Sequence, residues 1–417
     1  MKQININGGN ILSGTIRISG AKNSAVALVP ASILSDDVVK IDNIPNISDI
    51  DALNDILEFL GAKVKLKDGV MTIDPKSIEN KEIPKEISSK LRASYYFMSA
   101  LLGKYKHVEM YFPGGCKIGA RPIDQTLKGF KALGANIIEK DNKFIIDAEE
   151  LKGGHVYLDM PSVGATINTM LVAVKAKGLT IIENAAKEPE IVNVATFLNN
   201  MGAKITGAGT SEIRIKGVEK LSGCFTEVIP DRIETGTYII AGALLGDNLR
   251  IENIIPDHVE SLILKLKEMG VKLDIGNDYI VVNKCDNLKH VNLKTLGYPG
   301  FPTDLQQPIT TLLTQCTGTS ILEETIYENR FQNVKYLNKM GANIEIVGKK
   351  IKIKGPTKLK GKKVVATDLR AGACLILAAL AAKGTTTIKD IEHVLRGYEN
   401  IIQKLTNVGA KISLEEI

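Results

Sequence analysis

This sequence of 417 residues has no tryptophan and only 5% aromatic residues, and its net charge of +6 is not gathered into blocks of Lys and Arg, so it lacks the stacking side chains and basic patches of a nucleic-acid binder. Its longest apolar run, around residues 371–382, is interrupted by Gly372 and is far shorter than the ~20 residues that cross a bilayer. The first residues, MKQININGGNILSG, lack the charged-then-apolar pattern of a secretion signal. We therefore expect a cytoplasmic protein that binds neither nucleic acid nor membrane and whose charge suits small anionic ligands.

Cysteine and arginine are also scarce. The five cysteines, at positions 116, 224, 285, 316 and 374, are widely scattered and form no C-x-x-C pair, which argues against a disulfide framework and against a zinc site. Only nine of the 53 basic residues are arginine. Because the planar arginine fork grips phosphate or carboxylate with two parallel hydrogen bonds and lysine does not, each arginine is a candidate for anion binding.

The sequence does contain an internal repeat. A short phrase, such as LGAKVKL or MGANIEI, occurs six times, with its glycine at residues 61, 134, 202, 270, 341 and 409, which gives intervals of 73, 68, 68, 71 and 68 residues. Each copy follows a helical pattern. We therefore expect each glycine to end a helix in the left-handed conformation and a strand to follow.

Two further features recur in the same phase. Phrases such as ININGGNILSGTIRI and FIIDAEELKGGHVYL alternate apolar and polar residues around a glycine-bearing turn, which predicts two paired strands. Nearly all-apolar segments such as RASYYFMSALLG and RAGACLILAALAA follow, and a helix that is apolar on every side has to be buried on every side. Pro30 and Pro308 interrupt two of these segments, so the extent of those two helices stays open.

The repeat predicts an α/β (α+β) protein of six units, each with two strands, a buried helix, a connecting strand, an amphipathic helix and a closing strand. One unit cannot bury its own apolar helix, so three units would form each of two lobes of roughly 200 residues. The N-terminal strands precede the first buried helix and can pair with the end of the chain. This phase places the N-terminal lobe, with repeats 1–3, at residues 22–229, and the C-terminal lobe, with repeats 4–6, at residues 1–21 and 230–417.

The starts of the six buried helices are candidate anion sites, because helix N-termini carry partial positive charge and free N–H groups. If the units of a lobe are related by rotation, these starts point the same way, and two lobes facing each other would enclose a cationic cleft. The alternative is that these residues cap helices or form surface ion pairs. The residues at this phase of the repeat are Lys22 with Asn23, Arg92, Ser162–Gly164, Arg232, Asp304 and Arg370.

The second unit departs from the others at FPGGCKIGARPIDQ, a glycine-rich segment that contains Cys116, Lys117 and Arg121. Glycines suit a loop that folds over a ligand, and a thiol beside cations has a lowered pKa and is reactive. The alternative is that this cysteine is an inert small hydrophobe. We prefer that interpretation for Cys374, which lies within an apolar segment, and for Cys316.

Asp304, in PGFPTDLQQP, begins a helix and has two possible roles. An aspartate at this place most often caps the helix. If it instead faces a cleft with Lys22, Arg121 and Arg396, it is the carboxylate best placed to take a proton from a hydroxyl. Arg396, in VLRGYEN, lies at the phase where the last amphipathic helix begins, and Asp231 is a weaker acidic candidate.

The motifs SGAKNS, LRAS, PGGCKIGARPIDQ, PSVGAT, PDRIETGT, FPTD, ENRF and RGYE occur in this order, and over essentially the whole chain they resemble the UDP-N-acetylglucosamine 1-carboxyvinyltransferase family. The resemblance implies two inside-out α/β barrels with the active site between them. It implies transfer of the enolpyruvyl group of phosphoenolpyruvate to the 3-hydroxyl of UDP-N-acetylglucosamine, with release of phosphate, through a tetrahedral ketal. This is the first committed step of peptidoglycan precursor synthesis, and no metal or organic cofactor is implied.

The resemblance also assigns roles to residues. Cys116 matches the general acid, which in this family is also the target of fosfomycin, and Asp304 matches the acceptor of the hydroxyl proton. The positions that match phosphoenolpyruvate contacts are Lys22, Asn23, Arg121, Arg370 and Arg396. The positions that match nucleotide-sugar contacts are Asn23, Arg92, Arg121, Pro122, Ile123, Asp124, Gln125, Ser162, Val163, Gly164, Asp304 and Ile326.

Two positions depart from some family members, which carry lysine where this chain has Met160 and Ser48. Our hypothesis is that Lys117 balances the ligand charge instead and lowers the pKa of the Cys116 thiol. The alternative activity is that of the sister enzyme that makes 5-enolpyruvylshikimate 3-phosphate, which the Cys116 segment with RPIDQ disfavours. A non-catalytic regulator that binds nucleotide sugars is a second alternative. The expected partners are the two small substrates, and the sequence leaves the oligomeric state open, a monomer included.

Overall fold

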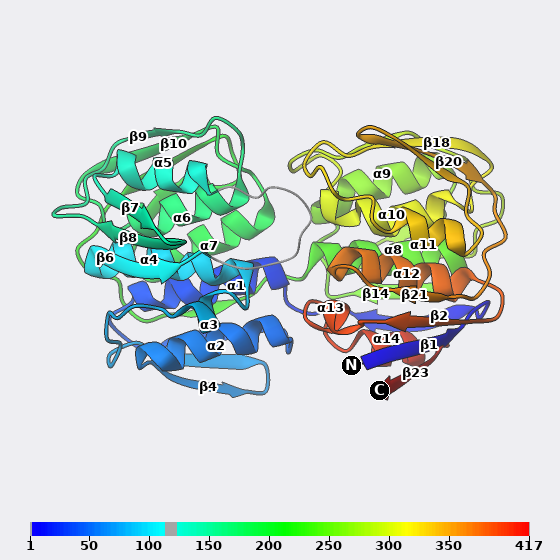
Figure 1. Cartoon of the computed structure of the whole chain (residues 1–417), viewed down its shortest axis with the longest axis horizontal. Coiled ribbons are helices and arrows are strands. Elements are labelled where there is room, and N and C mark those ends of the chain that lie inside the picture. Colours follow the sequence, from blue (N-terminus) through cyan, green and yellow to red (C-terminus); the bar gives the residue numbers. More distant parts are fainter. Residues whose placement is uncertain (1, 113–122, 417) are drawn as a thin grey trace. The chain divides into compact units, whose positions relative to one another are not determined.

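The computed structural model of this chain describes residues 2–112 and 123–416. Cys116, Lys117, Arg121 and Pro122 lie outside the described residues. The chain divides into two compact units (Figure 1). The described part of the N-terminal lobe is residues 20–112 and 123–229, and that of the C-terminal lobe is residues 2–19 and 230–416. No helix of the described residues is long and apolar enough to cross a membrane.

The described strands form six small sheets, so the fold is mixed α/β. The N-terminal lobe has, in strand order, the sheets β13 (Phe225–Glu227), β3 (Val39–Asp42), β5 (Val70–Asp74), β4 (Lys63–Lys67); β6 (His107–Tyr111), β8 (Lys143–Asp147), β7 (Asn136–Lys140); and β11 (Lys204–Thr206), β12 (Glu212–Lys216), β10 (Leu179–Glu183), β9 (His155–Tyr157). The C-terminal lobe has β21 (Lys363–Val365), β22 (Thr385–Lys389), β1 (Lys2–Asn7), β23 (Lys411–Glu416); β15 (Leu273–Ile275), β16 (Tyr279–Val282), β14 (Gly246–Glu252), β2 (Leu12–Arg17); and β17 (Leu293–Lys294), β18 (Gly318–Glu323), β20 (Lys350–Gly355), β19 (Ile344–Val347).

Twelve of the helices belong to the repeat. The buried set is α1 (Lys22–Ala31), α4 (Tyr95–Tyr105), α6 (Val163–Ala173), α8 (Arg232–Leu245), α10 (Gln306–Leu313) and α12 (Leu369–Ala381). The amphipathic set is α2 (Ser48–Leu60), α5 (Asp124–Ala132), α7 (Pro189–Asn200), α9 (Glu260–Met269), α11 (Val334–Lys339) and α14 (Ile401–Asn407). The other helices of the described residues are short turns: η1 (Ser32–Leu34), α3 (Lys85–Ser88), η2 (Arg92–Ser94), η3 (Pro256–Val259), η4 (Thr303–Leu305) and α13 (Glu392–Leu395).

The predicted helix–glycine–strand order is confirmed in all six copies. The glycines at 61, 134, 202, 270, 341 and 409 have φ between 92° and 108°, and each lies between an amphipathic helix and the next strand. A left-handed residue at this place turns the chain out of the helix, and glycine adopts it without a Cβ clash. Pro30 lies at the end of α1 and Pro308 in the first turn of α10, so neither proline breaks the middle of its helix.

The prediction that each glycine-bearing phrase forms a pair of strands is wrong. β8 and β9 belong to different sheets, and so do β12 and β13, β20 and β21, and β1 and β2. The link between the two strands carries the chain from one sheet to the next. Alternation of apolar and polar residues reports a half-buried strand, but it does not say which strand is its neighbour.

The sheets instead share one order. Each four-stranded sheet has one parallel pair at an edge and then two antiparallel strands; β9 with β10, followed by β12 and β11, is an example. In the three-stranded sheet a single parallel bridge between Ile83 and Met110 of β6 stands where the other sheets have a fourth strand. The six units therefore build one pattern despite their different sequences.

Within residues 2–112 and 123–416, the chain passes from one lobe to the other after Ser19 and again after Ile229. In the other repeats the parallel pair flanks one buried helix, as β9 and β10 flank α6. Here the partners are exchanged: β2, before α1, pairs with β14, and β13, before α8, pairs with β3. β1 pairs with β23, whereas β2 pairs with β14, so the prediction that the N-terminal strands pair with the chain's end is confirmed for β1 and wrong for β2.

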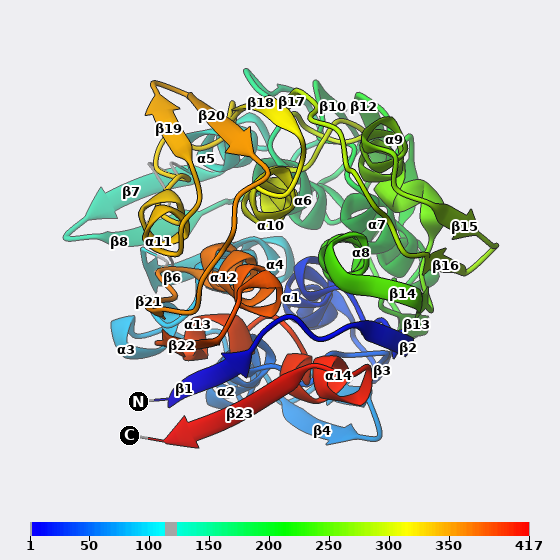
Figure 2. The ribbon, with the colours of Figure 1, turned by 90° about the vertical axis from the view of Figure 1, so that its right-hand side faces the viewer.

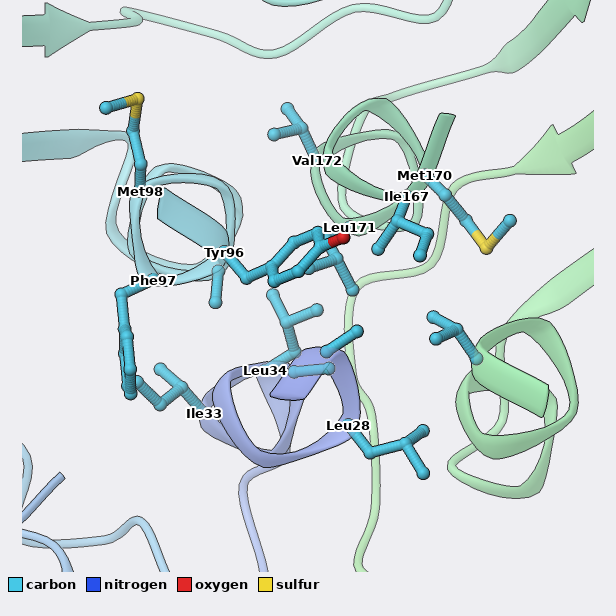
Figure 3. Packing of buried hydrophobic residues seen from close by; sticks show 14 of the residues in the cluster. Leu28, Ile33, Leu34, Tyr96, Phe97, Met98, Ile167, Met170, Leu171 and Val172 are labelled. Carbon is cyan, nitrogen blue, oxygen red and sulfur yellow. The ribbon is translucent and has the colours of Figure 1, made fainter. Parts of the chain in front are cut away.

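Each lobe buries its own set of apolar helices. In the C-terminal lobe α10 contacts both α8 and α12, and these three helices lie together in Figure 2. In the N-terminal lobe α4 contacts α1 and α6, and Figure 3 shows Tyr96 of α4 and Leu171 of α6 beside Leu34, which ends the turn η1 that follows α1. Because each apolar helix is covered by its neighbours in the same lobe, each lobe has a separate core.

Candidate active site

Asp304 is held by two arginines in the C-terminal lobe. It lies in η4, and its side chain caps neither η4 nor α10, so the helix-cap interpretation is wrong. Nη2 of Arg330 donates to its Oδ1 at 2.7 Å, while Nη2 and Nε of Arg370 donate to its Oδ2 at 2.8 and 3.2 Å. Both carboxylate oxygens therefore receive charged donors, which make the strongest class of hydrogen bond.

This pairing determines the charge of Asp304. Burial opposes ionisation of the carboxyl group, but the charges of Arg370 and Arg330 and their hydrogen bonds outweigh it and hold the pKa of Asp304 well below its usual range. The two arginine side chains are 4% and 3% exposed, whereas the Asp304 side chain is 24% exposed. Asp304 is thus an anion with one face open to a ligand.

Arg370 is held by two contacts besides those with Asp304. It lies in the first turn of α12, where the Asp368 carboxylate accepts its backbone N–H at 2.9 Å as the helix cap. Its guanidinium lies 5.3 Å from the ring centroid of Tyr398, whose hydroxyl is 2.9 Å from that of Thr237. These contacts aim the guanidinium fork at Asp304.

Arg396 belongs to the same part of the lobe. It is the residue after α13, and α14 begins only at Ile401, so the prediction that an amphipathic helix starts at Arg396 is wrong. The next residue, Gly397, packs so closely on Leu369 that an added Cβ would lie 2.6 Å from a Leu369 methyl carbon. This contact fixes the backbone beside Arg396 against the first turn of α12, which also carries Arg370.

In the N-terminal lobe, Lys22 begins α1 and pairs with a carboxylate at the start of α2. Its Nζ lies 2.7 Å from Oδ2 of Asp49, and the two side chains are 15% and 5% exposed. Ser24, in the first turn of α1, donates from its hydroxyl to Asn193. The buried carboxylate of Asp49 therefore holds Lys22, and Asn23 follows Lys22 in the same turn.

The starts of α4 and α6 meet beside Arg92. The guanidinium of Arg92, in η2, lies 5.7 Å from the Tyr95 ring centroid and 5.3 Å from that of Phe112. A Cβ at Gly164 would lie 1.9 Å from the Tyr95 hydroxyl, so a larger residue there would have to displace the Tyr95 ring. Ser162 caps α6 by accepting the N–H of Ala165 at 3.3 Å. The predicted residues 162–164 therefore adjoin Arg92, and η2 also contacts α1.

The start of α5 carries Asp124 and Gln125. The Gln125 side chain accepts the backbone N–H of Asp159 at 2.8 Å and donates to the Asp159 carboxylate at 3.0 Å. Lys128 also bonds that carboxylate, and these two hydrogen bonds lower the pKa of Asp159. Ile123 is buried in front of α5, whereas Met160, next to Asp159, is 63% exposed. The amide of Gln125 is thus oriented by its neighbours.

Several contacts of the candidate site residues were not predicted. Asp49, Arg330, Thr303 and Glu324 all contact predicted site residues or their neighbours, but only Arg330 carried a signal, because arginine is scarce in this chain. Asp231 proves to be the cap of α8, since its carboxylate accepts the backbone N–H groups of Ile233 and Glu234, in the first turn of α8, at 2.8 and 2.9 Å.

The cysteines that we interpreted as inert are confirmed as buried. Burial raises the pKa of Cys316 to about 12 and that of Cys374 to about 11, so neither thiol ionises readily. Cys116 lies outside the described residues. Among the described residues, no three His, Cys, Asp or Glu side chains gather closely enough to hold a metal ion.

Comparison with known proteins places the chain in a family. The family model described as EPSP synthase (3-phosphoshikimate 1-carboxyvinyltransferase) matches residues 6–405. UDP-N-acetylglucosamine 1-carboxyvinyltransferase 2 of Geobacillus kaustophilus is 53% identical over 417 residues, which cover 100% of this chain and 97% of that protein. The protein of the same name in Bacillus subtilis is 53% identical over 418 residues, with the same coverage. The chain therefore belongs to the EPSP synthase family and, within it, to the UDP-N-acetylglucosamine 1-carboxyvinyltransferases.

Solved structures agree with this fold. The enolpyruvyl transferase NikO from Streptomyces tendae matches with a TM-score of 0.90 and 26% identity, over 99% of this chain and 98% of that chain. An EPSP synthase from Acinetobacter baumannii matches with a TM-score of 0.77 over 100% of both chains. At 18% identity, the second likeness supports the fold alone.

Proposed function

We propose that this chain transfers the enolpyruvyl group of phosphoenolpyruvate to the 3-hydroxyl of UDP-N-acetylglucosamine and releases phosphate, with Cys116 as general acid and Asp304 as acceptor of the hydroxyl proton. The activity follows from 53% identity over the whole chain to relatives that carry this name. The observation that carries the residue assignment is the Asp304 cluster: a carboxylate with an exposed face, held between two arginines.

The chemistry needs an acid and a base. Protonation of the methylene carbon of phosphoenolpyruvate makes its neighbouring carbon electrophilic, and removal of the hydroxyl proton makes the sugar oxygen a nucleophile. Addition gives a tetrahedral ketal, and elimination of phosphate then restores the double bond. Cys116 is assigned the first proton transfer by its matching motif, and Asp304 the second.

Asp304 is a weak base while both arginines hold it, because each guanidinium stabilises its charged form. Phosphoenolpyruvate carries a phosphate and a carboxylate, and an arginine fork binds either group. If the substrate takes part of the bonding of Arg370 away from Asp304, the pKa of Asp304 rises toward its usual value. Substrate binding would then itself prepare the base.

The remaining assignments follow the family motifs. Lys22, Asn23, Arg121, Arg370 and Arg396 are proposed to hold phosphoenolpyruvate. Asn23, Arg92, residues 121–125, residues 162–164, Asp304 and Ile326 are proposed to line the nucleotide sugar. The neighbouring starts of α4 and α6 and the oriented amide of Gln125 support this second group.

We also propose the finer architecture and the cellular setting. Three sheets and three buried helices in each lobe support two inside-out α/β barrels, one formed from residues 22–229 and the other from residues 1–21 and 230–417. A role in peptidoglycan precursor synthesis implies a cytoplasmic enzyme that acts on two small substrates.

The experiment is phosphate release by the purified chain with each acceptor. We expect release with phosphoenolpyruvate and UDP-N-acetylglucosamine, and none with shikimate 3-phosphate. Cys116→Ser should lose about 10²–10⁴-fold of kcat, the usual contribution of a general acid, and all labelling by fosfomycin. Cys224→Ser is the matched control and should keep both. Activity only with shikimate 3-phosphate would overturn the proposal.

A further inference from the structure

Glu324 is a buried carboxylate that lies behind the Asp304 cluster. It follows β18 and is 2% exposed. Its Oε1 accepts the Thr295 hydroxyl at 3.0 Å and the backbone N–H groups of Ile326 and Tyr327 at 2.8 and 3.1 Å. Its Oε2 accepts the Thr303 hydroxyl at 2.8 Å. All four partners are donors, which is the arrangement that a carboxylate requires and an amide cannot fully satisfy.

Thr303 connects this carboxylate to the arginine that holds Asp304. Its hydroxyl donates to Glu324 and accepts from Nη1 of Arg330 at 2.9 Å. Nη2 of the same guanidinium bonds Asp304 at 2.7 Å. Because the guanidinium is a rigid planar fork, fixing one of its nitrogens also fixes the direction of the other.

We propose that Glu324 is a positioning residue for this reaction: through Thr303 and Arg330 it sets the orientation of Asp304, and through two backbone N–H groups it sets the segment that carries Ile326. This inference rests on the proposed function. It gives a role to a carboxylate that does not itself touch the substrate, and it joins the proposed proton acceptor to a proposed nucleotide-sugar contact.

Glu324→Gln tests the proposal with little change in volume. The amide oxygen of the variant can still accept from Thr295 and from the backbone. The amide NH2 group then faces Thr303, and the Thr303 hydroxyl loses the carboxylate oxygen to which it donates. We expect kcat to fall about 10–100-fold, since a small misplacement of a reacting group costs that much. The Michaelis constant for UDP-N-acetylglucosamine should rise, and the acid limb of the pH–rate profile should move to higher pH as Arg330 loosens from Asp304.

Glu323→Gln is the matched control, because Glu323 is the preceding residue and its carboxylate, 29% exposed, pairs with Lys350 at 3.5 Å. We expect kinetics within about two-fold of the wild type. Thermal unfolding of both variants reports whether either change disturbs the fold.

Variants of Thr303 test whether Glu324 acts by positioning Arg330 or only by stabilising the fold. Thr303→Val removes only the hydroxyl and leaves the other three bonds of Glu324 in place. We expect it to reproduce the loss of kcat and the pH shift without the change in the nucleotide-sugar constant. Thr303→Ser keeps the hydroxyl, so its kcat and its pH profile should match those of the wild type.

Two results would overturn the proposal. If Glu324→Gln has the kinetics of Glu323→Gln, Glu324 does not position the site. If Thr303→Val leaves kcat and the pH profile unchanged, the connection through Arg330 is wrong, even if Glu324→Gln is unstable. A wild-type chain inactive with UDP-N-acetylglucosamine would instead refute the proposed function, so the two failures are distinct.

Discussion

The two lobes hold their site cations in different ways. In the N-terminal lobe, Lys22 pairs with Asp49 and keeps 15% of its side chain exposed. In the C-terminal lobe, Arg330 and Arg370 are 3% and 4% exposed and clasp the single carboxylate of Asp304. The first arrangement presents a cation supported by a carboxylate, and the second presents a carboxylate supported by two cations.

This difference indicates a division of labour. Lysine is a point charge on a flexible stem, which can turn from its partner to an incoming anion at small cost. Arg330 and Arg370 are almost fully buried, and without the carboxylate of Asp304 they would be uncompensated charges in the protein interior. The C-terminal cluster should therefore be the more sensitive of the two, both in catalysis and in folding.

The largest effect is expected for Asp304→Asn. Loss of the proposed base should lower kcat by about 10²–10⁴-fold. Breaking a buried ion pair costs about 3–5 kcal/mol, and the exposed face of Asp304 should reduce that penalty in the free energy of unfolding. Phosphate release and urea denaturation measure the two effects. A variant with both normal turnover and normal stability would contradict the comparison.

A smaller, separable effect is expected for Asp49→Asn. Lys22 keeps its charge but loses the partner that directs it, so the Michaelis constant for phosphoenolpyruvate should rise about five-fold, corresponding to about 1 kcal/mol, while kcat changes less. Steady-state kinetics measure both constants. Asp55→Asn is the control, because Asp55 lies on the same helix, is 52% exposed and pairs with Lys90 at 3.1 Å. Equal effects of the two changes would show that Asp49 does not direct Lys22.

The sequence predicted the local backbone conformation better than it predicted which strands pair with each other. The six glycines were found because a left-handed helix end depends on residues that are adjacent in the chain. The strand partners were not, because β8 and β9 have the expected alternation but join different sheets. Alternation specifies which face of a strand is buried, whereas the neighbour depends on how the whole lobe packs.

The same distinction applies to the site. Lys22 and Arg370 were predicted because both lie at helix starts, a position that the repeat defines. Asp304 contacts arginines that are 26 and 66 residues further along the chain, and no periodicity reports that convergence. The support from Glu324 is equally hidden, since a buried carboxylate and an exposed one have the same letter in the sequence.

The smallest effect tests a second carboxylate–lysine pair, which resembles Lys22 and Asp49 in burial but lies in the C-terminal lobe. Glu234 and Lys404 are 2.6 Å apart, with side chains 4% and 16% exposed. Burial raises the pKa of Glu234 to about 7, although the charge of Lys404 opposes the rise. Because the folded lobe then binds a proton that the unfolded chain releases near pH 4.3, this group should destabilise the fold progressively as the pH rises from about 4.3 to 7.

Glu234→Gln removes the carboxyl group that binds this proton in the folded lobe. We expect the melting temperature of the variant, relative to the wild type, to increase by a few degrees between about pH 5 and 7 and then to level off. Differential scanning calorimetry across this range measures it. Glu268→Gln is the control, since Glu268 is 54% exposed and pairs only three residues away with Lys265, and its difference from the wild type should not change with pH in this range. A pH-independent difference for Glu234→Gln as well would mean that Lys404 compensates the buried charge completely, and the lysine pairs of the two lobes would then be equivalent.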